Sequence, residues 1–319
     1  MFLTPEVLIV LLLDGLILVF LTVAFFVALM VVRYFDFGQD TPLQYALERR
    51  SYLASVIVQF ALAFKIGLLF YFVYTLDKLS TIIPGAMCAA GVITANEYGV
   101  PLLLLKIVGI YLFGLWLVAN SADLETKDFR YTKLKFKFFI FIYLLVVAEY
   151  VLEIFYFKGL DVSKVVSCCG VLFNPLKSSA ASILLALPPR VAALLFYGVY
   201  GALLVAAWRR RVYLFSFLSM LFLPVGLIAL IEYFSPYIYE LPTHRCPFCI
   251  LQPEYGYIGY FLYAALFGGT FLGIKAGFEK LFLNKEPTLK YAVILDTLYV
   301  AMVSFYPIFY IIRNGVTLF

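Results

Sequence analysis

The chain has 319 residues, of which 65% are hydrophobic and only 13% are charged, and its formal net charge is +5. Soluble domains usually carry about 25% charged residues, so this composition excludes a soluble globular protein. The apolar runs are long and unbroken, which argues against the short alternating segments of a membrane barrel. We therefore expect an all-α, polytopic bundle of transmembrane helices in contact with the lipid bilayer. We expect no nucleic-acid partner, because no long loop holds a basic patch interleaved with aromatic residues.

Apolar runs predict about eight spans, which form a single membrane domain over residues 1–319. The predicted spans cover residues 6–32, 51–76, 100–119, 136–157, 189–208, 212–236, 255–274 and 289–312. The first run is too long for the apolar core of a cleavable signal peptide, so we interpret it as a span that is retained. Pro101, Pro189 and Pro287 stand near span starts, where a missing backbone N–H costs least.

Basic residues predict the orientation of these spans. Fifteen of the 24 Lys and Arg residues fall in the first, third, fifth and seventh loops, and seven fall in the other loops and the tails. The fifteen are Arg33, Arg49, Arg50, Lys127, Arg130, Lys133, Lys135, Lys137, Arg209, Arg210, Arg211, Lys275, Lys280, Lys285 and Lys290. Because cytoplasmic loops carry the excess of positive charge, we expect the odd loops in the cytoplasm. Both termini are then extracytoplasmic, and the membrane is interpreted as a bacterial inner membrane.

All five cysteines fall in the three even loops and are therefore expected on the extracytoplasmic side. They are Cys88, the neighbours Cys168 and Cys169, and the pair Cys246 and Cys249. Disulfides form readily in that compartment. Because five is an odd number, any two disulfides leave one thiol, which favours thiol exchange or metal binding over a purely structural framework.

The sequence Cys246-Pro247-Phe248-Cys249 is a Cys-x-x-Cys pair that can close a disulfide, and we expect it at the start of a helix. A helix N-terminus and nearby cations lower the pKa of a thiol and favour the reactive thiolate. His244 and Arg245 directly precede the pair. The pair is thus a candidate redox site, with a structural disulfide and a soft-metal site as the alternatives.

The stretch Cys246 to Gln252, "CPFCILQ", resembles the Cys-x-Leu-Cys-x-x-Gln-Arg stretch of the quinone-linked disulfide-bond formation membrane proteins. The resemblance covers seven residues, and Pro253 stands where that family has an Arg. It implies that Cys246 and Cys249 pass electrons to a membrane quinone and that the partner is a periplasmic thioredoxin-fold protein. We assign His244, Arg245 and Gln252 as candidate residues for binding the quinone.

Two other cysteine segments extend the candidate site. In Ser167-Cys168-Cys169-Gly170 the vicinal thiols close a disulfide only with strain, so they are redox-labile, bind metal or bond elsewhere, unless they are simply buried small side chains. In "IPGAMCAAG", which is apolar enough to re-enter the membrane, Met87 and Cys88 supply adjacent soft sulfurs, unless Met87 only packs. Thiolate, thioether and imidazole together suit Cu(I). The candidate metal ligands are Met87, Cys88, Cys168, Cys169, His244, Cys246 and Cys249.

Between the vicinal cysteines and the fifth span, residues 178–187 are interpreted as a short helix lying in the outer interface of the membrane.

Ionisable residues inside the predicted spans form a further candidate site, because such residues are costly in lipid and usually face a partner or a cavity. They are Asp14, Lys65, Lys106, Glu149, Glu153, Glu232 and Asp296. Glu149 and Glu153 are four residues apart and share one helix face. We interpret Lys106, Glu149, Glu153 and Glu232 as a candidate proton path. The alternative is a set of buried pairs, such as Lys106 with Glu149 or Glu153, that fix helix register.

Three functions remain open at this point. The first is a membrane thiol–disulfide oxidoreductase that passes electrons among Cys88, Cys168, Cys169, Cys246 and Cys249 and then to quinone or a partner protein. The second is a protein that handles or transports a soft metal, Cu(I). The third is a structural subunit of a larger membrane complex, with its cysteines locked in disulfides.

Overall fold

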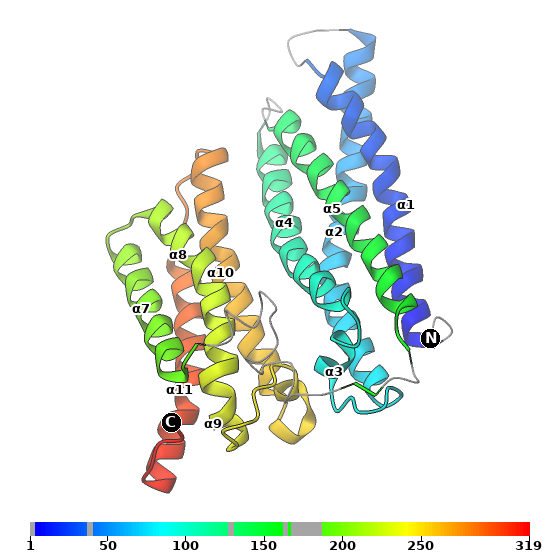
Figure 1. The fold of residues 1–319 in the computed structure, drawn as a ribbon. Helices are drawn as coiled ribbons and strands as arrows, with labels where there is room; N and C mark the ends of the chain where they lie inside the picture. The colour runs from blue at the N-terminus through cyan, green and yellow to red at the C-terminus, as the bar shows by residue number, and fades with distance from the viewer. Residues whose placement is uncertain (1–3, 37–40, 127–130, 162–164, 167–186) are drawn as a thin grey trace. The chain divides into compact units, whose positions relative to one another are not determined.

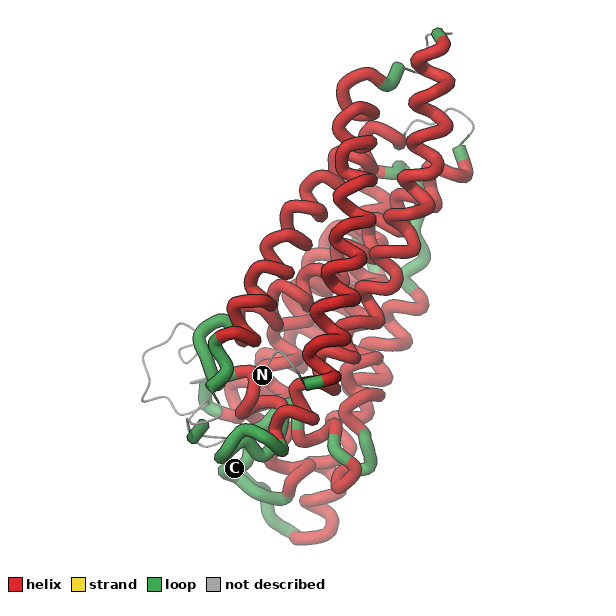
Figure 2. Tube along the Cα trace, turned by 90° about the vertical axis from the view of Figure 1, so that its right-hand side faces the viewer, coloured by secondary structure: helices red, strands yellow, loops and turns green. Residues whose placement is uncertain are grey.

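A computed structural model of the chain describes residues 4–36, 41–126, 131–161, 165–166 and 187–319. In these ranges every regular element is a helix (Figure 2). Eight helices within them are long and apolar enough to cross a membrane. The predicted all-α, eight-span architecture is therefore confirmed, and the chain is a multi-pass membrane protein.

The eight spans lie close to the predicted ranges (Figure 1). They are α1 (Pro5–Tyr34), α2 (Pro42–Ser80), α4 (Gly99–Glu125), α5 (Thr132–Lys158), α7 (Pro189–Trp208), Val212–Tyr239, α10 (Ile258–Phe282) and α11 (Lys290–Asn314). The span Val212–Tyr239 consists of α8 (Val212–Ala229), the π-helix η1 (Leu230–Phe234) and α9 (Ser235–Tyr239). The shorter elements are α3 (Ala89–Ile93) and the 3₁₀ helices η2 (Cys249–Leu251) and η3 (Pro253–Tyr255). The interfacial helix predicted over 178–187 lies, except for its last residue, outside the described residues.

The start of α2 differs most from the prediction, because it lies nine residues before residue 51. The hydroxyl of Thr41 accepts a hydrogen bond from the backbone N–H of Gln44 at 3.3 Å, and Pro42 occupies the first helical position. Both features stabilise a helix N-terminus. With 39 residues, α2 is about 58 Å long and extends beyond a hydrocarbon core of about 30 Å. The hydropathy of the sequence predicted only the apolar part of α2.

The chain divides into two compact units. Unit 1 comprises Met1–Pro84 and Val92–Val166, and unit 2 comprises Gly85–Gly91 and Ser167–Phe319. The short segment Gly85–Gly91 therefore lies within the sequence of unit 1 but packs as part of unit 2. This segment contains Cys88.

Unit 1 is a ring of four helices. α1 packs against α2 and α5, and α4 packs against α5 and α2. The core between them is apolar over most of its length and includes Leu21, Val58, Trp116 and Phe139. The indole N–H of Trp116 donates a hydrogen bond to the backbone oxygen of Lys135 at 3.0 Å, which satisfies the polar atom of this buried ring.

In unit 2, α10 lies between α8 and α11, and small residues on α10 allow both neighbours to approach closely. Gly269, Gly273 and Gly277 are spaced four apart, so they share one stripe of α10. A Cβ atom at Gly269 would overlap the carboxyl group of Asp296 on α11, and one at Gly273 would overlap the side chain of Ser219 on α8. Small residues at such spacing are typical of close helix packing in membranes.

The sixth span contains a π-helical turn that has a local cause. Pro236 lacks a backbone N–H, so it cannot donate to the oxygen of Glu232 four residues earlier. The helix widens before the proline, and the N–H of Ser235 donates to the oxygen of Leu230 five residues back. The wider turn carries Glu232, which is buried.

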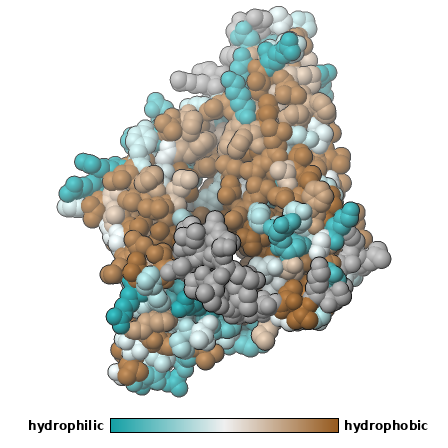
Figure 3. All heavy atoms as spheres, in the orientation of Figure 1, coloured by the Kyte–Doolittle hydropathy of each residue, from teal (hydrophilic) through white to brown (hydrophobic). Residues whose placement is uncertain are grey.

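The outer surface of the spans is apolar. Large side chains such as Leu12, Phe60 and Leu194 are more than half exposed in the isolated chain. Figure 3 shows hydrophobic residues covering much of the visible face, with separate hydrophilic patches among and around them. A surface of this kind indicates contact with lipid, which confirms the bilayer as a partner.

Candidate functional site

Three buried cysteine sulfurs meet in unit 2. The Sγ atoms of Cys88 and Cys246 lie 3.4 Å apart, although the two residues are 158 positions apart in the chain. One sulfur from each of Cys88, Cys246 and Cys249 lies within 4.8 Å of the others. Their exposed fractions are 0%, 0% and 6%, so the group is closed to solvent. We call these three residues the sulfur cluster.

Two tyrosines hold the loop that carries Cys246 and Cys249. The Tyr239 hydroxyl, at the end of α9, donates a hydrogen bond to the backbone oxygen of Cys246. The Tyr263 hydroxyl, on α10, donates to the backbone oxygen of Pro247 at 2.6 Å. The loop backbone is thus bonded to a helix on either side of it, which fixes the position of the Cys246 sulfur.

Cys88 reaches the cluster from the segment Gly85–Gly91. Gly85 adopts a positive φ of 83°, a conformation that favours glycine. The N–H of Gly91 then donates to the oxygen of Cys88 at 3.1 Å, where α3 begins. This turn directs the Cys88 side chain into the core of unit 2, next to Cys246 and Ala90.

The expected helix start at the Cys-x-x-Cys pair is wrong. Cys249 begins η2, a 3₁₀ helix of only three residues, and α10 begins nine residues later at Ile258. Gln252 is extended before Pro253, as is usual before proline. Gly256 and Tyr257 then adopt positive φ values of 64° and 56°. These breaks keep the pair in a loop.

The residues on either side of the Cys246–Cys249 pair make contacts outside the sulfur cluster or within the loop. The guanidinium group of Arg245 forms an ion pair with the carboxylate of Glu232. The ring of His244 lies edge-on to Tyr239, with ring centroids 4.3 Å apart, and its Nε2 atom is buried without a hydrogen-bond partner among the described residues. The N–H of Gln252 donates to the oxygen of Cys249 at 3.0 Å, which closes the turn of η2.

Three further predicted ligands are Met87, Cys168 and Cys169. Met87 is next to Cys88, yet its side chain is 77% exposed. Cys168 and Cys169 lie outside the described residues. The structure therefore brings together the cysteines of two of the three loops, the loop of Cys88 and the loop of Cys246 and Cys249.

Tyr255 contributes to the electrostatics around the sulfurs. Its ring lies 4.7 Å from that of Tyr239. Burial, followed by the negative charge of Cys249 when its thiol is ionised, raises the pKa of the Tyr255 hydroxyl above its ordinary value. Tyr255 therefore remains a neutral phenol next to the cluster.

Unit 1 holds a second buried group, which we call the charged cluster. It consists of Asp14 on α1, Lys65 on α2, Lys106 on α4, and Glu149 and Glu153 on α5. The Nζ atom of Lys106 lies 2.7 Å from Glu149 and 3.4 Å from Glu153. The buried pairs of Lys106 with Glu149 and Glu153, the alternative to a proton path, are thus present, and Asp14 and Lys65 complete the cluster. Glu232 belongs to unit 2 and pairs with Arg245 instead.

Asp296 is the remaining carboxyl group at membrane depth. It lies on α11 against Gly269 and is fully buried. Neither of its oxygens has a hydrogen-bond partner within the described ranges. Hydropathy and charge alone identify Asp296 as an intramembrane acid, but they do not reveal that it faces a glycine.

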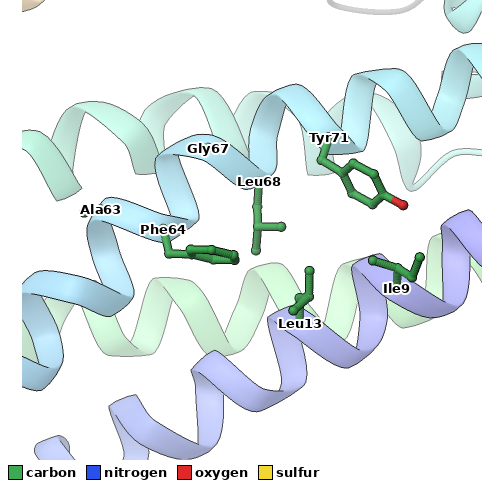
Figure 4. Close-up of a pocket in the computed structure, with 7 residues that line it drawn as sticks. All are labelled: Ile9, Leu13, Ala63, Phe64, Gly67, Leu68 and Tyr71. Atoms are coloured by element: carbon green, nitrogen blue, oxygen red, sulfur yellow. The ribbon is translucent and has the colours of Figure 1, made fainter.

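Unit 1 also has a groove of about 550 Å³ between α1 and α2 (Figure 4). Its lining residues are Ile9, Leu13, Ala63, Phe64, Gly67, Leu68 and Tyr71. The hydroxyl of Tyr71 is the polar side-chain atom among them, so the lining of the groove is otherwise apolar.

Comparisons with protein-family models, with curated proteins and with solved structures found no match to this chain. Its function is therefore inferred from the chemistry of its own residues.

Proposed function

We propose that this protein is a membrane thiol–disulfide oxidoreductase and that the sulfur cluster is its reactive site. The observation that carries the proposal is the 3.4 Å separation between the sulfurs of Cys88 and Cys246. A disulfide bond is about 2.05 Å long, so these two sulfurs are thiols in contact and not a bonded pair. Reacting atoms about 3–3.5 Å apart are in the range of a near-attack geometry.

The exchange step follows from this contact. When Cys246 and Cys249 form a disulfide, the thiolate of Cys88 attacks the Cys246 sulfur. The Cys88–Cys246 bond forms, the Cys246–Cys249 bond breaks, and Cys249 leaves as a thiolate that takes up a proton. Cys88 has lost one proton and Cys249 has gained one, so charge and electrons balance.

A two-electron acceptor completes the cycle. Two cysteine thiols and one quinone give one disulfide and one quinol, with two electrons and two protons transferred. The resemblance of Cys246 to Gln252 supports a quinone as the acceptor and a periplasmic thioredoxin-fold protein as the partner. The excess of basic residues in the odd loops supports an extracytoplasmic position of the site, in a bacterial inner membrane. Cys168 and Cys169 are proposed to carry electrons between the cluster and the partner.

The residues next to the pair have proposed supporting roles. Gln252 and His244 are candidates for binding the quinone, because they flank the pair on either side. Arg245 is half-buried and paired with Glu232, so its proposed role is to hold the loop and not to contact the quinone directly.

A second candidate function, soft-metal handling, is supported by the mutual distances of the three sulfurs. Bonds of about 2.3 Å to one metal ion separate thiolate sulfurs by about 4 Å, and the three sulfurs lie within 4.8 Å of one another. Thiolates favour Cu(I). In this function the copper ion is the cargo, and Cys88, Cys246 and Cys249 are its ligands.

Thiol counting distinguishes these functions. The reduced chain in lipid nanodiscs is mixed with a short-chain quinone, alkylated and weighed. Redox function predicts that two alkylatable thiols disappear for each quinol formed. The Cys249→Ser variant is expected to form no Cys88–Cys246 disulfide by exchange, as checked by peptide mapping, because it has no Cys246–Cys249 disulfide for Cys88 to attack.

Other results would reject the redox function or support one of the two alternatives. If neither quinone nor an oxidised thioredoxin-fold protein changes the thiol count, the redox function is rejected. Copper that co-purifies at one ion per chain, and is lost in each of the three Cys→Ser variants, would then support soft-metal handling. Cysteines that resist both mild reductant and quinone, without bound metal, would support a structural subunit.

A further inference from the structure

The charged cluster of unit 1 has one negative charge more than its positive charges can balance. Three carboxyl groups and two ammonium groups lie together, and every member is at most 4% exposed. An uncompensated charge is costly inside a protein and more so within a membrane. A proton or a small cation must therefore accompany the five side chains.

The contacts show which carboxyl group is least supported as an anion. Both oxygens of Asp14 are paired, Oδ1 with Lys65 at 2.8 Å and Oδ2 with Lys106 at 3.2 Å. The Oε1 atom of Glu149 bridges both ammonium groups, at 2.9 Å and 2.7 Å. Glu153 has a single ion pair, with Lys106, at the longest distance of the five, 3.4 Å.

Two carboxyl oxygens in the cluster are buried and have no hydrogen-bond partner among the described residues. They are Oε1 of Glu153 and Oε2 of Glu149, which lie one helical turn apart on α5. One oxygen from each of Asp14, Glu149 and Glu153 lies within 4.8 Å of the others. A hydrogen on Glu153 would thus have carboxylate acceptors close by, and it would satisfy a buried oxygen that otherwise has no partner.

The surroundings favour a proton over a metal ion. The ammonium groups of Lys65 and Lys106 already occupy the positions between the carboxylates, and their charge would repel a divalent cation. Among the described residues, the titratable groups that face the cluster are its own members and the hydroxyl of Tyr150 on α5, which donates to the backbone oxygen of Leu11 at 3.5 Å. The ring of Phe72 lies 4.9 Å from the Lys106 nitrogen. None of these supplies a further positive charge.

We propose that the charged cluster is a binding site for one proton and that the carboxyl group of Glu153 carries it. The proton makes the cluster electrically neutral within unit 1. This proposal is independent of the sulfur cluster, because it depends only on the four helices α1, α2, α4 and α5.

Infrared spectroscopy of the whole protein in lipid at neutral pH tests the proposal. A protonated carboxyl group gives a carbonyl stretch, distinct from the carboxylate bands, that shifts in deuterated water. We expect Glu153→Gln to remove one such band, and Glu279→Gln, whose carboxylate pairs with Lys275 outside the cluster, to leave it in place. Because glutamine has the shape and charge of a protonated glutamate, Glu153→Gln should melt at or above the temperature of the parent chain.

Three results would overturn the proposal. One is a spectrum of Glu153→Gln that keeps the band. Another is a melting temperature of Glu153→Gln that falls by roughly 5 °C or more. The last is a parent chain without the band whose melting temperature rises with added sodium, which would identify a monovalent cation as the ligand.

Discussion

The two buried clusters of this protein are held in different ways. The charged cluster is built from side chains within four long helices, and each ammonium group contacts at least two carboxylates. The sulfur cluster is built from loops, because Cys88 precedes α3 and Cys246 precedes η2. A charged residue that loses its partner within a membrane is costly, whereas a thiol that loses its neighbour remains a small, nearly apolar group. We therefore expect the charged cluster to control stability and the sulfur cluster to control chemistry.

The largest expected effect is that of Lys106→Met. This change removes the ammonium group that contacts Asp14, Glu149 and Glu153. Breaking a buried ion pair from one side costs about 3–5 kcal/mol, so we expect most of the chain to unfold or aggregate in size-exclusion chromatography. Lys275→Met is the control, because its partly exposed pair with Glu279 contributes about 0.5 kcal/mol or less. If both variants unfold or aggregate to the same extent, the charged cluster does not control stability.

Arg245→Gln tests an ion pair that lies next to the sulfur cluster. The Arg245 side chain is 28% exposed, while the carboxylate of Glu232 is fully buried. Because water screens part of this pair, we expect a loss of about 1–2 kcal/mol in the free energy of unfolding, measured by thermal melting. Arg313→Gln, whose pair with Glu240 is more than half exposed on both sides, is a matched control and should change little. A larger effect from Arg313 would show that burial does not determine the cost.

Cys246→Ser tests whether the sulfur cluster is needed for disulfide formation but not for the stability of the fold. The variant keeps the size of the side chain, and we expect it to lose about 1 kcal/mol of stability. Formation of a disulfide with Cys88 should nevertheless be abolished, as measured by alkylation after exposure to quinone. If the variant unfolds as readily as Lys106→Met, the sulfur cluster is structural and the comparison fails.

The smallest expected effect is that of Met87→Leu. The Met87 side chain is 77% exposed, so this change should alter stability by less than about 0.5 kcal/mol. Thiol exchange and the binding of added Cu(I) should both be unchanged, because the three buried sulfurs suffice. A loss of copper binding in this variant would add the thioether to the site.

The sequence predicts the number and order of the spans well, because lipid imposes long apolar runs. It does not predict the first turns of α2, where Glu48, Arg49 and Arg50 continue a helix beyond the apolar part. The π-helical turn is also missed, although Pro236 within an apolar run is a signal for it. Local caps and breaks depend on single hydrogen bonds that a hydropathy average does not contain.

The candidate sites are predicted in part. Glu149 and Glu153 on one face of a helix, with Lys106 as partner, follow from helical spacing and charge. That Lys65 and Asp14 join them depends on which helices are neighbours, and nothing in the individual spans specifies this. The contact between Cys88 and Cys246 is likewise beyond the sequence pattern, because it joins residues 158 positions apart. The exposure of Met87, next to the fully buried Cys88, depends on a turn at Gly85.

The placement of Gly85–Gly91 has a consequence for how the protein is made. During synthesis Cys88 is inserted with the helices of unit 1, while its neighbour Cys246 is still 158 residues from completion. Until then this segment has no core to enter, and the thiol is open to other partners in its compartment. A chain divided after Val166 would leave Cys88 on the first fragment and the residues it packs against on the second. Co-expressed halves would therefore assemble only if the Gly85–Gly91 segment of the first fragment packed into the core of the second fragment.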